Sequence, residues 1–244
     1  MTPLIEVRGL RFQYEDGTQA LDGVDFTLER GETVALFGAN GSGKTTFVLH
    51  LNGILRGEGN ISVCGMELSK QTLPQIRAKI GMVFQDSDEQ LFMPTVIEDV
   101  AFGPLNLGVS QHDAIHQAEA ALEQVGMLLA AGKVPYHLSA GEKKRVALAG
   151  VLAMNPEILV LDEPSTFLDP PGHANLVHLL RTLPQSKLII THDTHFAAAL
   201  AGRAVFFEKG KLVADGTVEE IVQRFQWSYS DLPADLRYSA QRRF

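Results

Sequence analysis

The sequence is short of cysteine and tryptophan and has no long apolar run, and these absences exclude several classes of protein. Cys64 is the single cysteine, so no disulfide can form within the chain, which fits a reducing compartment. No stretch of about 18 uncharged apolar residues is present, so we expect no membrane-spanning helix. Residues 1–6 lack the basic and then apolar layout of a signal peptide.

Basic residues are also few. Lys and Arg total 21 against 29 Asp and Glu, which gives a formal net charge of −8. Such an acidic chain has no basic face for sequence-independent binding, so we expect no nucleic acid among its partners. Hydrophobic residues make up 45% of the chain, which is typical of a globular protein and excludes a disordered one. The length of 244 residues suits one large domain or two small ones.

Alternating apolar and helical patterns predict an α/β fold with a mainly parallel sheet. Strands buried on both faces are expected at 34–37, 80–84, 158–161 and 188–190. The N-terminal part differs, because residues 4–12 and 21–28 alternate apolar and polar positions around the turn signal Glu15-Asp16-Gly17. This alternation predicts antiparallel strands with one solvated face.

Helical patterns are expected in two further places. Between about residues 95 and 154, apolar residues such as Ala114, Ala118 and Leu122 recur at spacings of three and four, which predicts a helical insertion in the sheet. Thr217 and Glu220 form a capping-box pattern, which predicts a final helix beginning at Thr217. We assign no element to the tail from about residue 226.

Residues 38–45 read G-A-N-G-S-G-K-T and fit the pattern G-x-x-x-x-G-K-[S/T] between an expected strand and an expected helix. Glycines let backbone N–H groups converge on phosphate oxygens, and the helix N-terminus faces the same anion. We expect Lys44 to reach the β- and γ-phosphates of a nucleotide and Thr45 to hold Mg²⁺. The nucleotide-binding residues predicted here are Gly38, Asn40, Gly41, Ser42, Gly43, Lys44, Thr45 and Thr46.

Polar side chains end three of the expected parallel strands, where ligands of open α/β sheets bind. Asp162 follows the strand at 158–161 and is expected to reach Mg²⁺ directly or through water. Glu163 is then placed to polarise a water for attack on the γ-phosphate, and His192, after the next strand, is expected to orient Glu163. Gln85 ends a third strand, where a neutral side chain can ligate Mg²⁺ or sense the attacking water.

A further motif, L-S-A-G-E-K-K-R at 138–145, precedes an apolar stretch. Ser139 and Glu142 form a capping-box pattern that any helix can have, but a capped helix N-terminus is also an anion site. The motif resembles the ABC ATPase signature L-S-G-G-Q. The other motifs stand in the order of that family, from the phosphate loop through Gln85, the signature, Asp162-Glu163 and S-T-F-L-D at 165–169 to His192. This resemblance implies a P-loop NTPase fold with a RecA-like, mainly parallel sheet, and an ATP hydrolase that uses ATP and Mg²⁺.

Three other stretches narrow the resemblance. Residues 83–92, 95–104 and 141–150 look like the ATPase subunits of energy-coupling factor transporters, closest to the cobalt/nickel type, although vitamin-type members share these stretches. The resemblance implies one ATP-binding domain over residues 1–244. We expect a catalytic core with an antiparallel β subdomain at 1–89 and 156–225, a helical subdomain at 90–155 and a C-terminal tail at 226–244.

The partners follow from the same resemblance. It implies a head-to-tail dimer with a second copy or a paralogue, in which Ser139 and Gly141 contact the γ-phosphate bound on the partner chain. Tyr14 matches the aromatic residue that stacks on adenine, and residues 86–92, with Gln90 and Leu91, match the segment that contacts an integral membrane coupling subunit. A separate membrane subunit is expected to bind the substrate, with this chain peripheral at the cytoplasmic face of the cell membrane.

Two departures from the family pattern and two alternatives remain. Ala140 stands where the commonest signature has glycine, which requires a negative φ there and a β-carbon that points away from the phosphate. Glu142 replaces glutamine, and we assign it no phosphate role. Residues 143–145 are either solvated or near the membrane subunit. A soluble, non-transport ABC ATPase is the alternative function, although the segment between Gln85 and the signature is short and lacks sustained heptads.

His112 and His116 are four residues apart on an expected helix, which is a spacing suited to a metal ion. Without a third ligand nearby, a solvated helix face is the favoured interpretation. We do not expect a transported cobalt or nickel ion to bind to this chain.

Overall fold

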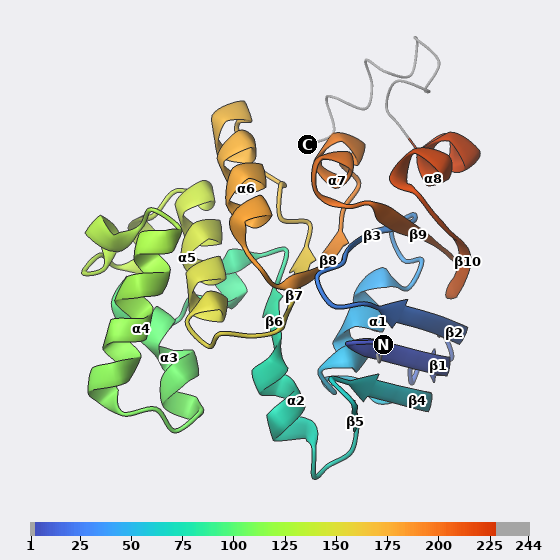
Figure 1. Ribbon diagram of the computed structural model, residues 1–244, viewed down its shortest axis with the longest axis horizontal. Helices are drawn as coiled ribbons and strands as arrows, with labels where there is room; N and C mark the ends of the chain where they lie inside the picture. The colour runs from blue at the N-terminus through green and yellow to red at the C-terminus, as the bar shows by residue number, and fades with distance from the viewer. Residues whose placement is uncertain (1–2, 228–244) are drawn as a thin grey trace.

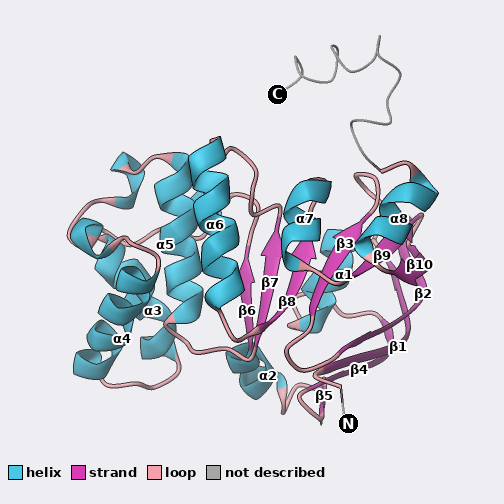
Figure 2. Cartoon of the chain, turned by 45° about the horizontal axis from the view of Figure 1, so that its top comes forward, coloured by secondary structure: helices cyan, strands magenta, loops and turns pink. Residues whose placement is uncertain are grey.

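A computed structural model describes residues 3–227 of the chain and shows two sheets joined by helices (Figures 1 and 2). The four-stranded sheet is antiparallel in the order β2-β1-β4-β5. Its strands are β1 (Ile5–Gln13), β2 (Gln19–Leu28), β4 (Glu58–Val63) and β5 (Met66–Glu67). The first two confirm the antiparallel pair expected at the N-terminus. The β4–β5 hairpin had no prediction, because its few apolar residues do not alternate clearly.

The six-stranded sheet has the order β10-β9-β3-β8-β7-β6. All neighbours pair in parallel except β9 and β10, which form an antiparallel hairpin at one edge. The predicted mainly parallel sheet is therefore confirmed. Its strands are β3 (Thr33–Phe37), β6 (Ile80–Val83), β7 (Ile158–Asp162), β8 (Ser186–Ile190), β9 (Arg203–Glu208) and β10 (Lys211–Gly216).

Three helices between β6 and β7 gather at one side of the molecule, in green and yellow at the left of Figure 1. They are α3 (Val96–Asn106), α4 (Gln111–Gln124) and α5 (Ala140–Leu152), with single 3₁₀ turns η1 (Ser87–Glu89), η2 (Leu128–Ala130) and η3 (Pro135–His137) around them. They occupy the region where a helical insertion was expected. The subdomain boundaries remain a prediction.

The remaining helices follow strands of the two sheets. They are α1 (Lys44–Leu51), α2 (Leu73–Lys79), α6 (Pro170–Thr182), α7 (Thr194–Leu200) and α8 (Val218–Phe225). Helix α8 begins after Thr217, whose backbone N–H donates to Glu220 Oε2 at 2.9 Å while its hydroxyl accepts from the Glu220 N–H at 3.2 Å. The predicted capping box and helix start are confirmed.

Helix α1 lies between the two sheets and joins them through Phe47. This side chain is fully buried, with its ring centroid 5.4 Å from Phe26 of β2 and 5.3 Å from Phe207 of β9. Aromatic pairs at such distances add to the free energy gained from burial. Because α1 is held on both sides, the loop that precedes it has a fixed position relative to the ends of the parallel strands.

Strands β3, β6, β7 and β8 are parallel, so their carboxyl ends lie along the same edge of the sheet. The segments that follow these four strands begin at Gly38, Phe84, Glu163 and Thr191. The topology therefore brings four of the sequence motifs together, although they are far apart in the chain.

Gly81 allows β6 and α5 to approach closely, which gives a test of this packing. A Cβ at Gly81 would overlap Val151 of α5 and lie 3.0 Å from Pro156, whereas one at Gly202 would meet nothing within 4 Å. We expect Gly81→Ala to cost roughly 1–3 kcal/mol, which lowers Tm by about 2–4 °C per kcal/mol. Gly202→Ala is the matched control. Thermal melts in which both variants match the wild type would contradict this packing.

Candidate nucleotide-binding site

The loop at 38–45 lies tightly against neighbouring backbone. Gly38 has φ of 139° and Gly43 has φ of 108°, a region that side chains disfavour. A Cβ at Gly43 would also lie 2.5 Å from the carbonyl oxygen of Ala20, and one at Gly38 would overlap that of Phe207. Only glycine fits at these two positions, so the two glycines allow the loop to pack closely against the neighbouring backbone at the N-terminus of α1.

Lys44 is buried inside this loop. Its Nζ donates to the carbonyl oxygens of Gly38 at 2.6 Å and Ala39 at 3.0 Å. Burial lowers the pKa of Lys44, and the nearby Glu163 and Asp162 carboxylates partly oppose this. A buried ammonium at a helix N-terminus, surrounded by glycine backbone, is suited to binding a phosphate group.

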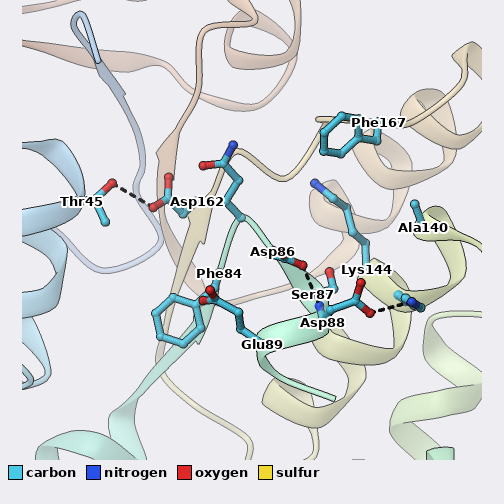
Figure 3. Close-up of a pocket in the computed structure, with 12 residues that line it drawn as sticks. Thr45, Phe84, Asp86, Ser87, Asp88, Glu89, Ala140, Lys144, Asp162 and Phe167 are labelled. Atoms are coloured by element: carbon cyan, nitrogen blue, oxygen red, sulfur yellow. Dashed lines mark hydrogen bonds and ion pairs between the residues drawn. The ribbon is translucent and has the colours of Figure 1, made fainter. Parts of the chain in front are cut away.

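Thr45 and Asp162 join the loop to the sheet. The Thr45 hydroxyl donates to Asp162 Oδ2 at 3.0 Å, from the first turn of α1 to the end of β7 (Figure 3). Both residues and Gln85 line one cavity of about 570 Å³. Burial raises the pKa of Asp162, and the Thr45 hydrogen bond partly opposes this. Three oxygen donors beside a phosphate-binding loop are a set that fits Mg²⁺, which binds few protein oxygens and keeps several waters.

Glu163 has an unusual environment next to this cavity. Its φ is +46°, in the left-handed region, and burial raises its pKa to about 7. Its Oε2 accepts weakly from the backbone N–H of His192 at 3.4 Å, whereas Oε1 has no hydrogen-bond partner among residues 3–227. A buried carboxylate with a free oxygen and a raised pKa is suited to accepting a proton from water.

His192 lies between the phosphate loop and Glu163. Its Nε2 is 3.0 Å from Asn40 Oδ1 and 3.5 Å from Glu163 Oε1. Burial, followed by the charge of Lys44, lowers the pKa of His192, which favours the neutral ring. Its ring centroid is 5.6 Å from that of Trp227, a residue of the unassigned tail that sequence reasoning missed. The structure therefore places His192 near Glu163, and its role in orienting that carboxylate stays a prediction.

Tyr14 lies beside the end of the phosphate loop. Its hydroxyl is 2.9 Å from Thr46 Oγ1, and the residue is 40% exposed, so one side of the ring remains accessible. Phe12 contacts its edge with a centroid distance of 4.9 Å. This position suits the expected stacking on a base, which stays a prediction.

Ser139 and Gly141 do not line the cavity that contains Thr45, although Ala140 between them does. They line a second cavity of about 880 Å³ together with Phe167, Leu168 and Asp169. The predicted capping box is present, because the Ser139 N–H donates to Glu142 Oε2 at 2.8 Å and the Glu142 N–H to Ser139 Oγ at 3.3 Å. Glu142 therefore caps its own helix, which agrees with the expectation that it has no phosphate role.

Ala140 is in the first turn of α5 and is absent from the residues with positive φ among those described. The condition of a negative φ is thus met, and the direction of the Ala140 β-carbon relative to a phosphate stays a prediction. Gln90, in contrast, was expected to face a membrane subunit, and that is wrong. Its amide turns inward, accepting from the Phe84 N–H at 2.8 Å and donating to the Met82 carbonyl at 3.1 Å. A polar side chain beside the unpaired end of a strand satisfies that backbone.

Lys144 was expected to be solvated or near the membrane subunit, and the structure contradicts the solvated alternative. The residue is 8% exposed, and its Nζ donates to the carbonyl oxygens of Glu163 at 2.8 Å and Pro164 at 3.3 Å. Burial lowers its pKa to about 8. Lys143 instead forms an ion pair with Asp88 at 2.6 Å. Successive residues of a helix point about 100° apart, so two neighbouring lysines can have different surroundings although they look alike in the sequence.

His112 and His116 are both exposed on α4, with their Nε2 atoms 3.3 Å apart. Their exposure agrees with a solvated helix face. Among residues 3–227, no group of three or more His, Cys, Asp or Glu side chains is arranged to hold a metal ion. Within the same residues, no helix has the length and apolar character needed to cross a membrane.

Comparison with known proteins gives one family. Residues 21–166 match the ABC transporter family. A putative ABC transporter ATP-binding protein of Streptomyces avermitilis is 52% identical over 221 residues, which are 90% of this chain and 84% of that protein. The energy-coupling factor transporter ATP-binding protein EcfA of Methanothermobacter thermautotrophicus is 47% identical over 89% of this chain and 72% of its own.

Two solved structures are also similar. The structure of cbiO1 from Clostridium perfringens, part of the ABC transporter complex cbiONQ, has a TM-score of 0.82 and 34% identity over 93% of each chain. The dimeric ATP-binding cassette MJ0796, in a post-hydrolysis state bound to ADP and Pi, has a TM-score of 0.79 and 27% identity over 88% of this chain and 98% of its own.

The raised pKa of Glu163 predicts a pH-dependent stability in buffer free of nucleotide and Mg²⁺. The folded state keeps the Glu163 proton up to about pH 7, but the unfolded chain releases it near 4.5, so stability decreases between these pH values. Glu163→Gln removes this effect, so we expect its free energy of unfolding relative to the wild type to rise from pH 5 to pH 8 by at most about 3 kcal/mol, with a corresponding rise in relative Tm.

The control for this experiment is Glu157→Gln. Lys79 and Arg30 lower the pKa of Glu157, so this group is ionised in the folded and the unfolded chain between pH 5 and pH 8, and the substitution lowers Tm by a similar amount at both pH values. Thermal melts that show no pH-dependent difference between Glu163→Gln and the wild type would contradict the buried, protonated carboxyl.

Proposed function

Because the chain belongs to the ABC transporter family of ATP hydrolases, we propose that it powers import through an energy-coupling factor transporter, with cobalt or nickel ions as the cargo. Its cofactors are ATP and Mg²⁺. The transporter type is supported by relatives named as energy-coupling factor ATP-binding proteins. The similarity to cbiO1, from the cbiONQ complex, supports the metal cargo.

One observation carries the proposed mechanism. Lys44, Thr45 and Asp162 form one half of a nucleotide site, while Ser139 and Gly141 line a different cavity of the same chain. The two cavities meet at Ala140, Lys144 and Phe167, so a single copy has the capped helix N-terminus, which is suited to an anion, beside its catalytic cavity and not within it. Two copies, or this chain and a paralogue, facing each other head to tail bring the two halves together. The dimeric cassette MJ0796 supports this arrangement.

Each side chain then has a separate role in hydrolysis. Lys44 binds the β- and γ-phosphates, and Tyr14 stacks on adenine. Thr45, Gln85 and Asp162 would hold Mg²⁺, which neutralises phosphate charge when bound. Glu163, oriented by His192, accepts a proton from the attacking water.

Opening and closing of the dimer follow from the γ-phosphate. With ATP bound, this phosphate contacts Lys44 of one chain and Ser139 of the other, so ATP favours the closed state. Hydrolysis separates the phosphate from the nucleotide and removes this shared contact. ATP shifts the equilibrium only by its greater affinity for the closed state.

A surface near β6 suits the integral membrane coupling subunit. Phe92 is 62% exposed and Phe102 is 41% exposed, and their rings meet edge to face at 4.9 Å. Exposed aromatic pairs of this kind are typical of protein interfaces. We assign this surface to the coupling subunit at the cytoplasmic face of the membrane. A second membrane subunit would bind the cargo, which this chain does not contact.

The contact of one γ-phosphate with both chains can be tested with two variants. We expect Glu163→Gln to bind ATP, to hydrolyse it at least about 100-fold more slowly and to accumulate as a dimer, measured by size-exclusion chromatography with light scattering. Adding Ser139→Arg puts bulk and charge at the seam and abolishes that dimer without preventing ATP binding. Rapid steady-state hydrolysis by Glu163→Gln would exclude Glu163 as the base.

The cargo is tested with the complete transporter. We expect this chain to co-purify with two kinds of membrane subunit, and the complex in liposomes to take up Co²⁺ or Ni²⁺ when ATP is present on the ATPase side. The complex with Glu163→Gln is the control and transports neither ion. Uptake of a vitamin would favour the vitamin type, and absence of membrane subunits would favour a soluble ABC ATPase.

A further inference from the structure

Lys144 is a buried charge for which the mechanism above has no role. It begins the second turn of α5, is 8% exposed and lines the cavity that also contains Thr45 and Asp162 (Figure 3). Its ammonium donates to the carbonyl oxygens of Glu163 at 2.8 Å and Pro164 at 3.3 Å. Burying a lysine costs free energy that hydrogen bonds must offset, so these two contacts determine where the group lies.

The backbone that Lys144 contacts is itself strained. Glu163 has φ of +46° and is followed by Pro164, although a residue before proline favours extended conformations. Such conformations cost free energy and persist only where their surroundings hold them. The Glu163 carbonyl also accepts from the Thr166 N–H at 3.2 Å, and the Glu163 N–H donates to Ile190 at 2.9 Å.

The ammonium makes its hydrogen bonds to this backbone, whereas it acts on the carboxylates of Asp162 and Glu163 through its charge alone. Among residues 3–227, no ion pair within 4.0 Å joins Lys144 to Asp162 or to Glu163, whereas both of its hydrogen bonds go to carbonyl oxygens. Removing the ammonium therefore leaves the side chain of Glu163 chemically unchanged and takes one hydrogen-bond donor away from each of the carbonyl oxygens of Glu163 and Pro164.

We infer that Lys144 is a positioning residue for ATP hydrolysis: by binding the carbonyls of Glu163 and Pro164, it fixes the left-handed backbone that directs the Glu163 carboxylate toward the attacking water. The inference rests on the proposed role of Glu163 as the base. Helix α5 then has a second role, because the helix that is capped by Ser139 also holds the loop that carries Glu163 in the same chain.

The chain offers a close control in Lys187. This lysine is 5% exposed, and its Nζ donates to the carbonyl oxygens of Leu183 at 2.8 Å and Gln185 at 2.7 Å. It lies near the start of β8, whereas the catalytic residues follow the carboxyl ends of the strands. Lys187 therefore matches Lys144 in burial and bonding but is remote from the site.

The experiment compares full-length Lys144→Met, Lys144→Arg and Lys187→Met with the wild type, below the lowest Tm. We expect Lys144→Met to lower kcat for ATP at least about tenfold with KM within about twofold, because the loop that carries the base loses its support while phosphate binding does not. Lys144→Arg retains the donors and regains most of kcat. Lys187→Met lowers Tm to a similar extent and keeps the wild-type kcat.

Several results would overturn the inference. Wild-type kcat in Lys144→Met would show that the loop needs no lysine, and an equal loss in Lys187→Met, or no recovery in Lys144→Arg, would reduce Lys144 to a structural residue. A rise of KM alone would make it a binding residue. Glu163→Gln is assayed in parallel: turnover at the wild-type rate there would refute the proposed base, whereas an inactive Glu163→Gln beside an active Lys144→Met refutes only the lysine inference.

Discussion

The hydrogen bond between Thr45 and Asp162 is the contact on which the rest of the site depends. It joins the first turn of α1 to the end of β7 at 3.0 Å, so the phosphate loop and the catalytic strand have one relative position. Phe47 of α1 stabilises that position by packing against both sheets. The parallel order of β3, β8, β7 and β6 then places Gln85, Glu163 and His192 around the same edge. The chemistry is local, but the geometry comes from the sheet.

Charge balance is the second constraint. Two lysines and two carboxylates lie close together at this edge of the sheet. Lys44, Lys144 and Asp162 are buried, and Glu163 is half-buried. Burial shifts the pKa of each toward its neutral form, and the opposite charges limit these shifts. The two lysines satisfy this need differently, since Lys44 bonds to the loop that binds phosphate and Lys144 bonds to the loop that carries the base.

Much of this was predictable from the sequence. The spacing of residues 38–45 between a strand and a helix fixes the phosphate loop, and apolar runs that end in Asp162 and near Gln85 predict parallel strands and a shared edge. Contacts that depend on side-chain direction were not predictable. Lys143 and Lys144 look equivalent in the sequence, and Gln90 looks free, because only the assembled fold determines which of them meets backbone. The β9–β10 hairpin was not predicted, because the apolar residues of these strands do not indicate that the hairpin lies at the edge of the sheet.

Helix α5 is attached at closely spaced points to different parts of the molecule. Ser139 caps its start on an outer surface, Lys143 bonds to Asp88 of η1, and Lys144 bonds to the turn after β7. A helix fastened in this way tilts as one rigid rod, so its angle cannot change at one attachment and stay constant at the others. A contact at Ser139 or at η1 that moved this helix would therefore also move the backbone beside Glu163.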